Sequence, residues 1–122
     1  MLIVDDSIVR GTTSRYLVDM IREAKPSEVH FLVSSPPIIE PCFYGMDFPS
    51  REELVANVYD RDVKKIAEAL GVDSLNYLSA FGLVSAVKEA NASKHEYCTA
   101  CFTGDYPVPV NLGTEKEELD LN

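Results

Sequence analysis

Two adjacent carboxylates and a hydroxyl-rich turn lie together near the start of the chain. Asp5 and Asp6 directly follow the apolar run of residues 2–4. Adjacent carboxylates at a strand end can accept hydrogen bonds from vicinal hydroxyls, or hold Mg²⁺ directly or through water. The next segment, called the 7–14 loop below, reads Ser7, Ile8, Val9, Arg10, Gly11, Thr12, Thr13, Ser14.

The 7–14 loop has the composition of an anion-binding turn. Gly11 lets the backbone approach a ligand closely. The hydroxyls of Thr12, Thr13 and Ser14, together with successive amides at a helix N-terminus, can donate to a phosphate that the helix dipole also favours. An acid pair beside such a turn suits a phosphorylated sugar. The structural alternative is a strand that ends in an Asx turn, with Thr13 as a helix cap.

The elements around this turn predict a βαβ unit. Residues 2–4 form a short apolar run, typical of a buried parallel strand. After the 7–14 loop, apolar side chains recur at helical spacing, namely Leu17, Met20, Ile21 and Ala24. Thr or Ser is available as the N-cap of this helix, and Lys25-Pro26 ends it. Residues 28–35 are rich in β-branched and aromatic side chains and predict a second strand. Strand, helix and strand in this order imply a parallel sheet.

The pattern changes after the second strand, and we expect the strand-helix alternation to stop there. A proline-punctuated loop covers residues 36–49, and the capping box of Ser50 and Glu53 opens a short helix. Further helices are expected around residues 63–70, closed by a glycine, and 83–90. Residues 73–79 are ambiguous, and residues 96–112 are expected to be extended.

One βαβ unit cannot cover both faces of its sheet, and a sheet that starts at the first residue leaves an edge in need of partners. We therefore expect the chain to be the back part of something larger. The expected divisions are residues 1–49, a mainly helical extension over 50–112 and an acidic tail over 113–122.

Charge and composition exclude several classes of partner. The 122 residues include 20 acidic and 11 basic side chains, a formal net charge of −9. Binding to nucleic acid or to an anionic membrane surface is therefore not expected. No apolar run approaches the roughly 18 residues of a membrane span, and an acidic residue at position 5 comes too early for a secretory signal. A reducing cytoplasm is the expected location.

Three cysteines form a second constellation. Cys98 and Cys101 have the CxxC spacing that lets two thiolates reach one metal, and Cys42 lies in a distant loop, which suggests a site assembled by folding. Three thiolates are one fewer than the four ligands of a closed metal site. Ordinary buried or free thiols are the alternative. His30 and His95 are isolated, and we expect structural or solvated roles for them.

Residues 2–13 are similar to the phosphoribosyl pyrophosphate (PRPP) motif of type I phosphoribosyltransferases. Four further stretches resemble the carboxyl-terminal third of the glutamine PRPP amidotransferase family, in the family's order: Ser34 to Ile38, Pro41 to Asp47, Asp73 to Ser79 and Tyr97 to Pro107. The resemblance implies an α/β fold, a partial type I phosphoribosyltransferase domain. It also implies a reaction in which ammonia from glutamine displaces pyrophosphate from PRPP and gives 5-phosphoribosylamine, the first committed step of purine synthesis.

The resemblance also assigns roles to the residues singled out above. It gives Asp5 and Asp6 to the ribose hydroxyls and Mg²⁺, and the 7–14 loop to the 5′-phosphate of PRPP. Cys42, Cys98 and Cys101 match ligands of a [4Fe–4S] cluster whose fourth cysteine lies upstream of this chain, with zinc as the less favoured metal. The family's glutaminase domain is not in this sequence, so we expect half a site and no turnover here, and a homo-oligomer at full length.

Two other functions are compatible with the PRPP motif alone. One is another PRPP-dependent transferase, acting on a nucleobase. The other is a PRPP-sensing regulator that binds without catalysis. Neither needs a metal-binding tail, so the segment from Cys98 to Gly104 favours the amidotransferase family over both.

Overall fold

The computed structural model describes residues 1–91 and 96–110 of the chain. Three parallel strands form one sheet in the order β1-β2-β3, namely β1 (Leu2–Asp5), β2 (His30–Val33) and β3 (Ser74–Tyr77). The strands pair in register, with Ile3 opposite Phe31 and Phe31 opposite Leu75. The predicted parallel α/β architecture is confirmed.

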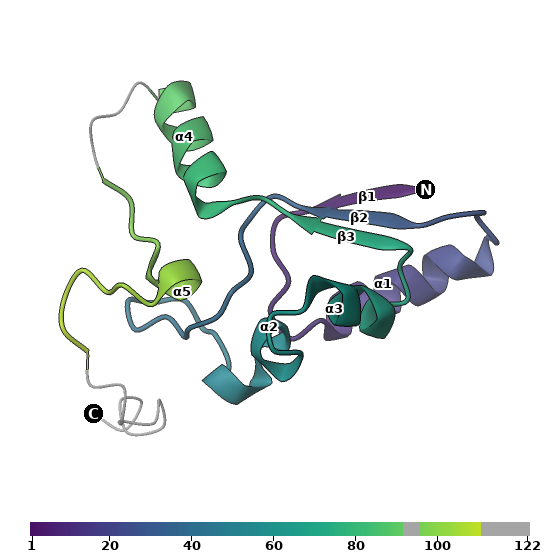
Figure 1. Ribbon diagram of the computed structural model, residues 1–122, viewed down its shortest axis with the longest axis horizontal. Helices are drawn as coiled ribbons and strands as arrows, with labels where there is room; N and C mark the ends of the chain where they lie inside the picture. The colour runs from purple at the N-terminus through teal and green to yellow at the C-terminus, as the bar shows by residue number, and fades with distance from the viewer. Residues whose placement is uncertain (92–95, 111–122) are drawn as a thin grey trace.

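Helices lie between the strands and after the last of them along the described part of the chain. They are α1 (Thr12–Glu23), the 3₁₀ turn η1 (Arg51–Glu53), α2 (Val55–Val58), α3 (Val63–Leu70), α4 (Ala80–Asn91) and α5 (Ala100–Thr103). Figure 1 shows α1, α2 and α3 on one side of the sheet, with α4 rising from the end of β3 on the other side. No helix in the described ranges is long and apolar enough to cross a membrane.

The expectation that the alternation stops after β2 is wrong. Residues 74–77, within the ambiguous stretch, form β3 and extend the sheet. The sheet thus continues into the segment expected to be a mainly helical extension, although the domain boundaries themselves stay a prediction. Residues 96–110 are also not extended throughout, because α5 interrupts them.

One face of the sheet carries the hydrophobic core. Ile3, Phe31, Val33 and Leu75 are buried against α1 and α3, with Val18 and Ile66 fully buried among them. Strand side chains alternate between faces, so every second residue points to the core. This burial fixes the register of the three strands.

The other face of the sheet is bare in the part of the chain that the structure describes. Leu2, Val4 and Leu32 are exposed by 58%, 67% and 37%. Parallel sheets are normally covered on both faces. The observed exposure agrees with the expectation that a single layer of helices leaves one face open.

Helix ends follow the local sequence signals at α3 and η1 but not at the start of α1. At α3, Asp62 accepts hydrogen bonds from the first-turn amides, and Gly71 ends the helix with φ of 78°. The capping box of Ser50 and Glu53 is present at η1. At α1 the expected Thr or Ser cap is wrong, because the N-cap is Gly11 with φ of 81° and no side chain caps the helix.

Candidate functional site

The acid pair lies where β1 ends. The backbone N–H of Asp6 donates to Oδ1 of Asp5 at 2.9 Å, and the Ser7 hydroxyl donates to Oδ1 of Asp6 at 3.0 Å. Ser34, just after β2, donates through both its N–H and its hydroxyl to the Asp5 carbonyl. These bonds hold the two carboxylates beside the carboxyl ends of two neighbouring strands, where open α/β sheets bind ligands.

The 7–14 loop carries the chain from β1 into α1. Thr12 and Thr13 are exposed at the start of the helix, whose first-turn amides receive no side-chain cap. The left-handed Gly11 makes this sharp entry possible, because a side chain at positive φ is strained. Uncapped amides at a helix N-terminus suit an anion.

Not all of the 7–14 loop faces the surface. Ile8 is 2% exposed and belongs to the core cluster, so its side chain anchors the loop and cannot meet a ligand. Ser14 is 5% exposed and offers an incoming molecule little surface. The exposed hydroxyls of the loop are therefore those of Thr12 and Thr13.

A surface hollow of about 380 Å³ lies behind the 7–14 loop, between α1, α2 and α3. Its floor is apolar and its rim carries two guanidinium groups, each paired with a carboxylate: Arg10 with Glu53 at 3.0 Å and Arg15 with Asp19 at 3.1 Å. Its lining residues are Arg10, Gly11, Thr12, Arg15, Tyr16, Val55, Tyr59, Ala69 and Leu70.

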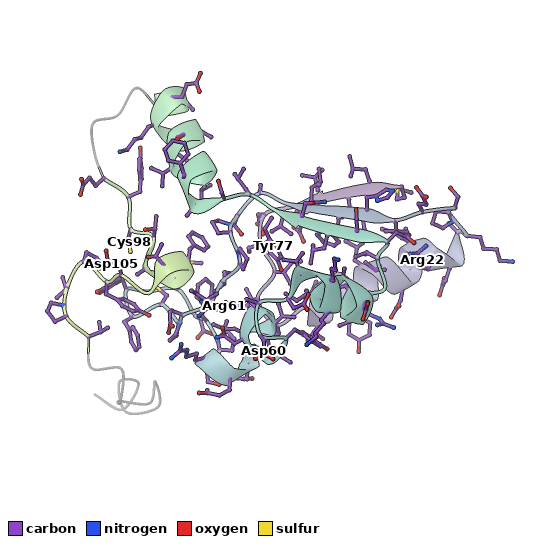
Figure 2. All side chains as sticks on the ribbon, in the orientation of Figure 1. Arg22, Asp60, Arg61, Tyr77, Cys98 and Asp105 are labelled. Atoms are coloured by element: carbon purple, nitrogen blue, oxygen red, sulfur yellow. The ribbon has the colours of Figure 1, made fainter. Side chains whose placement is uncertain are left out.

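The segments that carry the three cysteines lie against each other. The backbone N–H groups of Ile39 and Glu40 donate to the Cys101 carbonyl at 2.9 and 3.1 Å. Tyr106 donates to the Pro41 carbonyl at 2.7 Å. The loop that holds Cys42 is thereby fastened to α5 and the residues after it. Figure 2 shows Cys98 beside α5, at the opposite end of the molecule from Arg22.

The thiol of Cys101 lies close enough to the other two cysteines to be affected by them electrostatically. Burial, followed by the nearby thiols of Cys42 and Cys98, raises the pKa of Cys101. The Tyr44 N–H donates to Sγ of Cys42 at 3.3 Å. All three cysteines are free, and within residues 1–91 and 96–110 no three His, Cys, Asp or Glu side chains lie close enough to hold a single metal ion.

Two other polar side chains, those of His30 and Tyr77, lie at or near the sheet. His30 faces the Ser74 hydroxyl through Nδ1 at 2.9 Å and the Glu28 carboxylate through Nε2 at 3.0 Å, which fits the structural role expected for it. His95 and the acidic tail lie outside the described residues. The Tyr77 hydroxyl is buried without a hydrogen-bond partner in the described part of the chain, and burial raises the pKa of Tyr77 to about 12.

The sequence of this chain was compared with those of known proteins. No family model matches the chain. The amidophosphoribosyltransferase of Archaeoglobus fulgidus is 53% identical over 110 residues, which are 90% of this chain and 23% of that protein. The amidophosphoribosyltransferase of Bacillus subtilis is 48% identical over 115 residues, covering 93% of this chain and 24% of that protein.

A solved structure agrees with these sequence matches. Glutamine PRPP amidotransferase from B. subtilis, complexed with ADP and GMP, superposes with a TM-score of 0.78 at 45% identity, over 93% of this chain and 25% of that one. The chain is homologous to one segment of the amidophosphoribosyltransferases. It spans about a quarter of the length of the curated relatives it matches.

The shared segment contains every candidate site residue. The match to the Synechocystis amidophosphoribosyltransferase covers 99% of this chain at 46% identity. Sequence reasoning found the acid pair, the 7–14 loop and the cysteines, but not Glu53 as a partner of Arg10. The two lie 43 residues apart, and the only local signal at Glu53 is its place in the capping box.

Proposed function

We propose that this chain carries the ribose 5-phosphate half of the PRPP site of an amidophosphoribosyltransferase. The observation that carries the proposal is the uncapped N-terminus of α1, entered through the left-handed Gly11 directly after the acid pair of β1. In the whole enzyme, ammonia from glutamine would displace pyrophosphate at the anomeric carbon and give 5-phosphoribosylamine.

The residues of this chain would act by positioning and charge. The amides and hydroxyls of Thr12 and Thr13 bind the 5′-phosphate, while Asp5 and Asp6 accept hydrogen bonds from the ribose hydroxyls. Displacing a good leaving group at an anomeric carbon needs alignment and charge stabilisation more than a base. The acid pair therefore holds the sugar and need not take a proton.

The acid pair also fits Mg²⁺. This ion usually binds through one or two carboxylates, together with waters and substrate phosphates, and not in a cage made wholly of protein. Asp5 and Asp6 each engage one carboxylate oxygen in the hydrogen bonds described above. When bound, the ion would neutralise charge on the departing pyrophosphate.

Cys42, Cys98 and Cys101 are proposed as three ligands of a [4Fe–4S] cluster. Soft thiolates suit iron–sulfur clusters, whose properties respond to hydrogen bonds at sulfur such as the one from Tyr44 to Cys42. A single zinc ion is less favoured, because no three ligating side chains of the described residues are close enough to share one ion. The fourth ligand would come from outside this chain.

The remaining partners and the location follow from the same proposal. The family's glutaminase domain would complete the enzyme, the full-length protein would be a homo-oligomer, and the location would be cytoplasmic. Nucleic acid and membranes are not proposed as partners, because the net charge of −9 opposes binding to phosphate-rich surfaces.

Titration of the ¹⁵N-labelled chain with ribose 5-phosphate tests the proposal. We expect amide shifts centred on Gly11 to Ser14 that weaken as salt screens the phosphate. Ribose without phosphate is the matched control and should leave these amides unchanged. An absence of shifts at millimolar ribose 5-phosphate and PRPP would contradict the proposal.

A further inference from the structure

The Glu53 carboxylate joins two segments that are far apart in the sequence. Its Oε1 accepts a hydrogen bond from Nε of Arg10 at 3.1 Å and lies 3.0 Å from Nη2 of the same side chain. Its Oε2 accepts from both the N–H and the hydroxyl of Ser50 at 3.1 Å each. One carboxylate thus completes the capping box of η1 and also forms an ion pair with Arg10, in the middle of the 7–14 loop.

The loop residues on either side of Arg10 also rest on α2. The Val55 N–H donates to the Val9 carbonyl at 2.8 Å. A Cβ added to Gly11 would lie 3.3 Å from Cγ2 of Val55 and 3.4 Å from Cδ2 of Leu70, so the backbone there is already close to the helices. Arg10 lies between these two contacts, and the partner of its long side chain is Glu53.

We infer that Glu53 is a positioning residue for the 7–14 loop. Resting on the function proposed above, the inference is that Glu53 holds Arg10 so that the amides of Gly11, Thr12 and Thr13 keep the arrangement that receives the 5′-phosphate. Glu53 acts through Arg10 and does not touch the ligand.

The charge state of Glu53 supports this role. The backbone N–H of Ser50 first, and then the Arg10 guanidinium, lower the pKa of Glu53. The carboxylate is therefore ionised at neutral pH and pairs with the cation of Arg10. Both side chains are about half exposed, and exposed pairs contribute modestly, which sets the size of the expected effect.

The test compares Glu53→Gln with Glu52→Gln in the full 122-residue chain. Gln can replace Glu in a capping box, so Glu53→Gln removes the charge that faces Arg10 while the turn can still form. Glu52 is its exposed neighbour in the same turn, so Glu52→Gln changes the net charge equally. We expect the dissociation constant for ribose 5-phosphate to rise about two- to fivefold in Glu53→Gln and to stay unchanged in Glu52→Gln.

A double-mutant cycle separates positioning from a general loss of stability. If Glu53 acts through Arg10, Glu53→Gln should have no further effect on ligand affinity once Arg10→Gln is present. A purely structural role would lower the melting temperature of Glu53→Gln and leave the affinity of the folded protein unchanged. Equal effects of Glu52→Gln and Glu53→Gln, or additive effects with Arg10→Gln, would overturn the inference.

Failure of the proposed function can be recognised separately. If the wild-type chain binds neither ribose 5-phosphate nor PRPP, that function fails, and the positioning role is then tested without ligand. The ¹⁵N relaxation of Gly11 to Thr13 should show greater picosecond-to-nanosecond mobility in Glu53→Gln than in Glu52→Gln. Equal mobility in the two variants would remove the inference on its own.

Discussion

The carboxylate of Asp73 lies 2.7 Å from Nη2 of Arg22 and joins the last turn of α1 to the residue before β3. The same carboxylate accepts the backbone N–H of Val29 at 2.7 Å, next to β2. Arg22 also donates to the Gly71 carbonyl at 2.9 Å. One ion pair therefore holds together the helix and the two strands that follow it.

Acid should weaken this junction. The Val29 N–H and then Arg22 lower the pKa of Asp73. The stability it contributes is complete above its unfolded pKa of roughly 4 and is lost as the pH falls through the lower folded value. We expect Asp73→Asn to lower the free energy of unfolding at pH 7, measured by urea unfolding. Below about pH 4 this free energy should fall less steeply in the variant than in the wild type. Asp105→Asn, at an exposed carboxylate, is the control. Parallel pH curves for Asp73→Asn and wild type would contradict the prediction.

Gly11→Ala should damage both stability and binding. A side chain at positive φ costs roughly 1–2 kcal/mol, and its Cβ would press against Val55 and Leu70. Gly71→Ala is the matched control, because its φ is 78° and its nearest neighbour lies 3.7 Å from the added Cβ. We expect a larger loss of unfolding free energy for Gly11→Ala, and a loss of ribose 5-phosphate binding in that variant alone. Equal losses in both variants would mean that the contact of the added Cβ with Val55 and Leu70 does not lower stability.

Removing the hydroxyl of Tyr77 should not destabilise the protein. This oxygen is buried beneath the end of β3, at the position labelled in Figure 2, and has no partner among the described residues. An unsatisfied buried polar group costs about 1–3 kcal/mol. Tyr77→Phe should therefore leave the free energy of unfolding equal or raise it by about 1 kcal/mol. Tyr59→Phe, at a half-buried tyrosine packed against the same core, is the comparison. A clear loss of stability in Tyr77→Phe would mean that the hydroxyl has a partner.

The cysteines should differ in reactivity when no metal is bound. The thiolate is the nucleophile, and burial raises the pKa of Cys101 while Cys98 is exposed. At pH 8 we expect iodoacetamide to label Cys98 faster than Cys101, as followed by mass spectrometry of peptides. In urea the two rates should converge. Faster labelling of Cys101 in the folded chain would contradict the burial described for it.

Loss of the acid pair or the loop hydroxyl should impair the use of PRPP in a full-length enzyme. In the proposed site, Asp5→Asn would remove charge that faces the ribose hydroxyls and Mg²⁺. Thr13→Val would remove a hydrogen-bond donor to the phosphate, which would weaken binding by about 1 kcal/mol or more. Synthesis of 5-phosphoribosylamine should fall, while glutaminase activity measured without PRPP should largely survive. Equal loss of both activities would mean that these residues act through folding.

The first half of the fold could be predicted because its signals are local. An apolar run, a helical period and a second β-rich run are all visible between residues 2 and 35. The strand β3 was not predictable in the same way, since Ser74 and Asn76 occupy the bare face and Leu75 is the one residue of the strand that is buried. The four residues of α5 are too few to show a helical period.

The candidate site was predicted in part for the same reason. The acid pair and the 7–14 loop are contiguous in sequence, so residue types alone reveal them. The N-cap was missed because Gly11 acts through its backbone conformation, whereas the sequence suggested a hydroxyl side chain. The pairing of Arg10 with Glu53 depends on the fold, which brings together residues that are distant in the chain.

The bare face of the sheet restricts how the sheet can grow. Crossovers between parallel strands are right-handed, so the direction in which the chain steps decides which face a helix covers. Here the chain steps from β1 to β2 to β3, and α1 and α3 share one face. If further parallel strands joined the sheet beside β1, their crossover helices would cover Leu2, Val4 and Leu32 only if each successive strand lay farther from β1 than the one before it in the chain. The direction would then reverse at β1, and such a reversal opens a crevice at the carboxyl ends of the strands, where Asp5 and Asp6 lie.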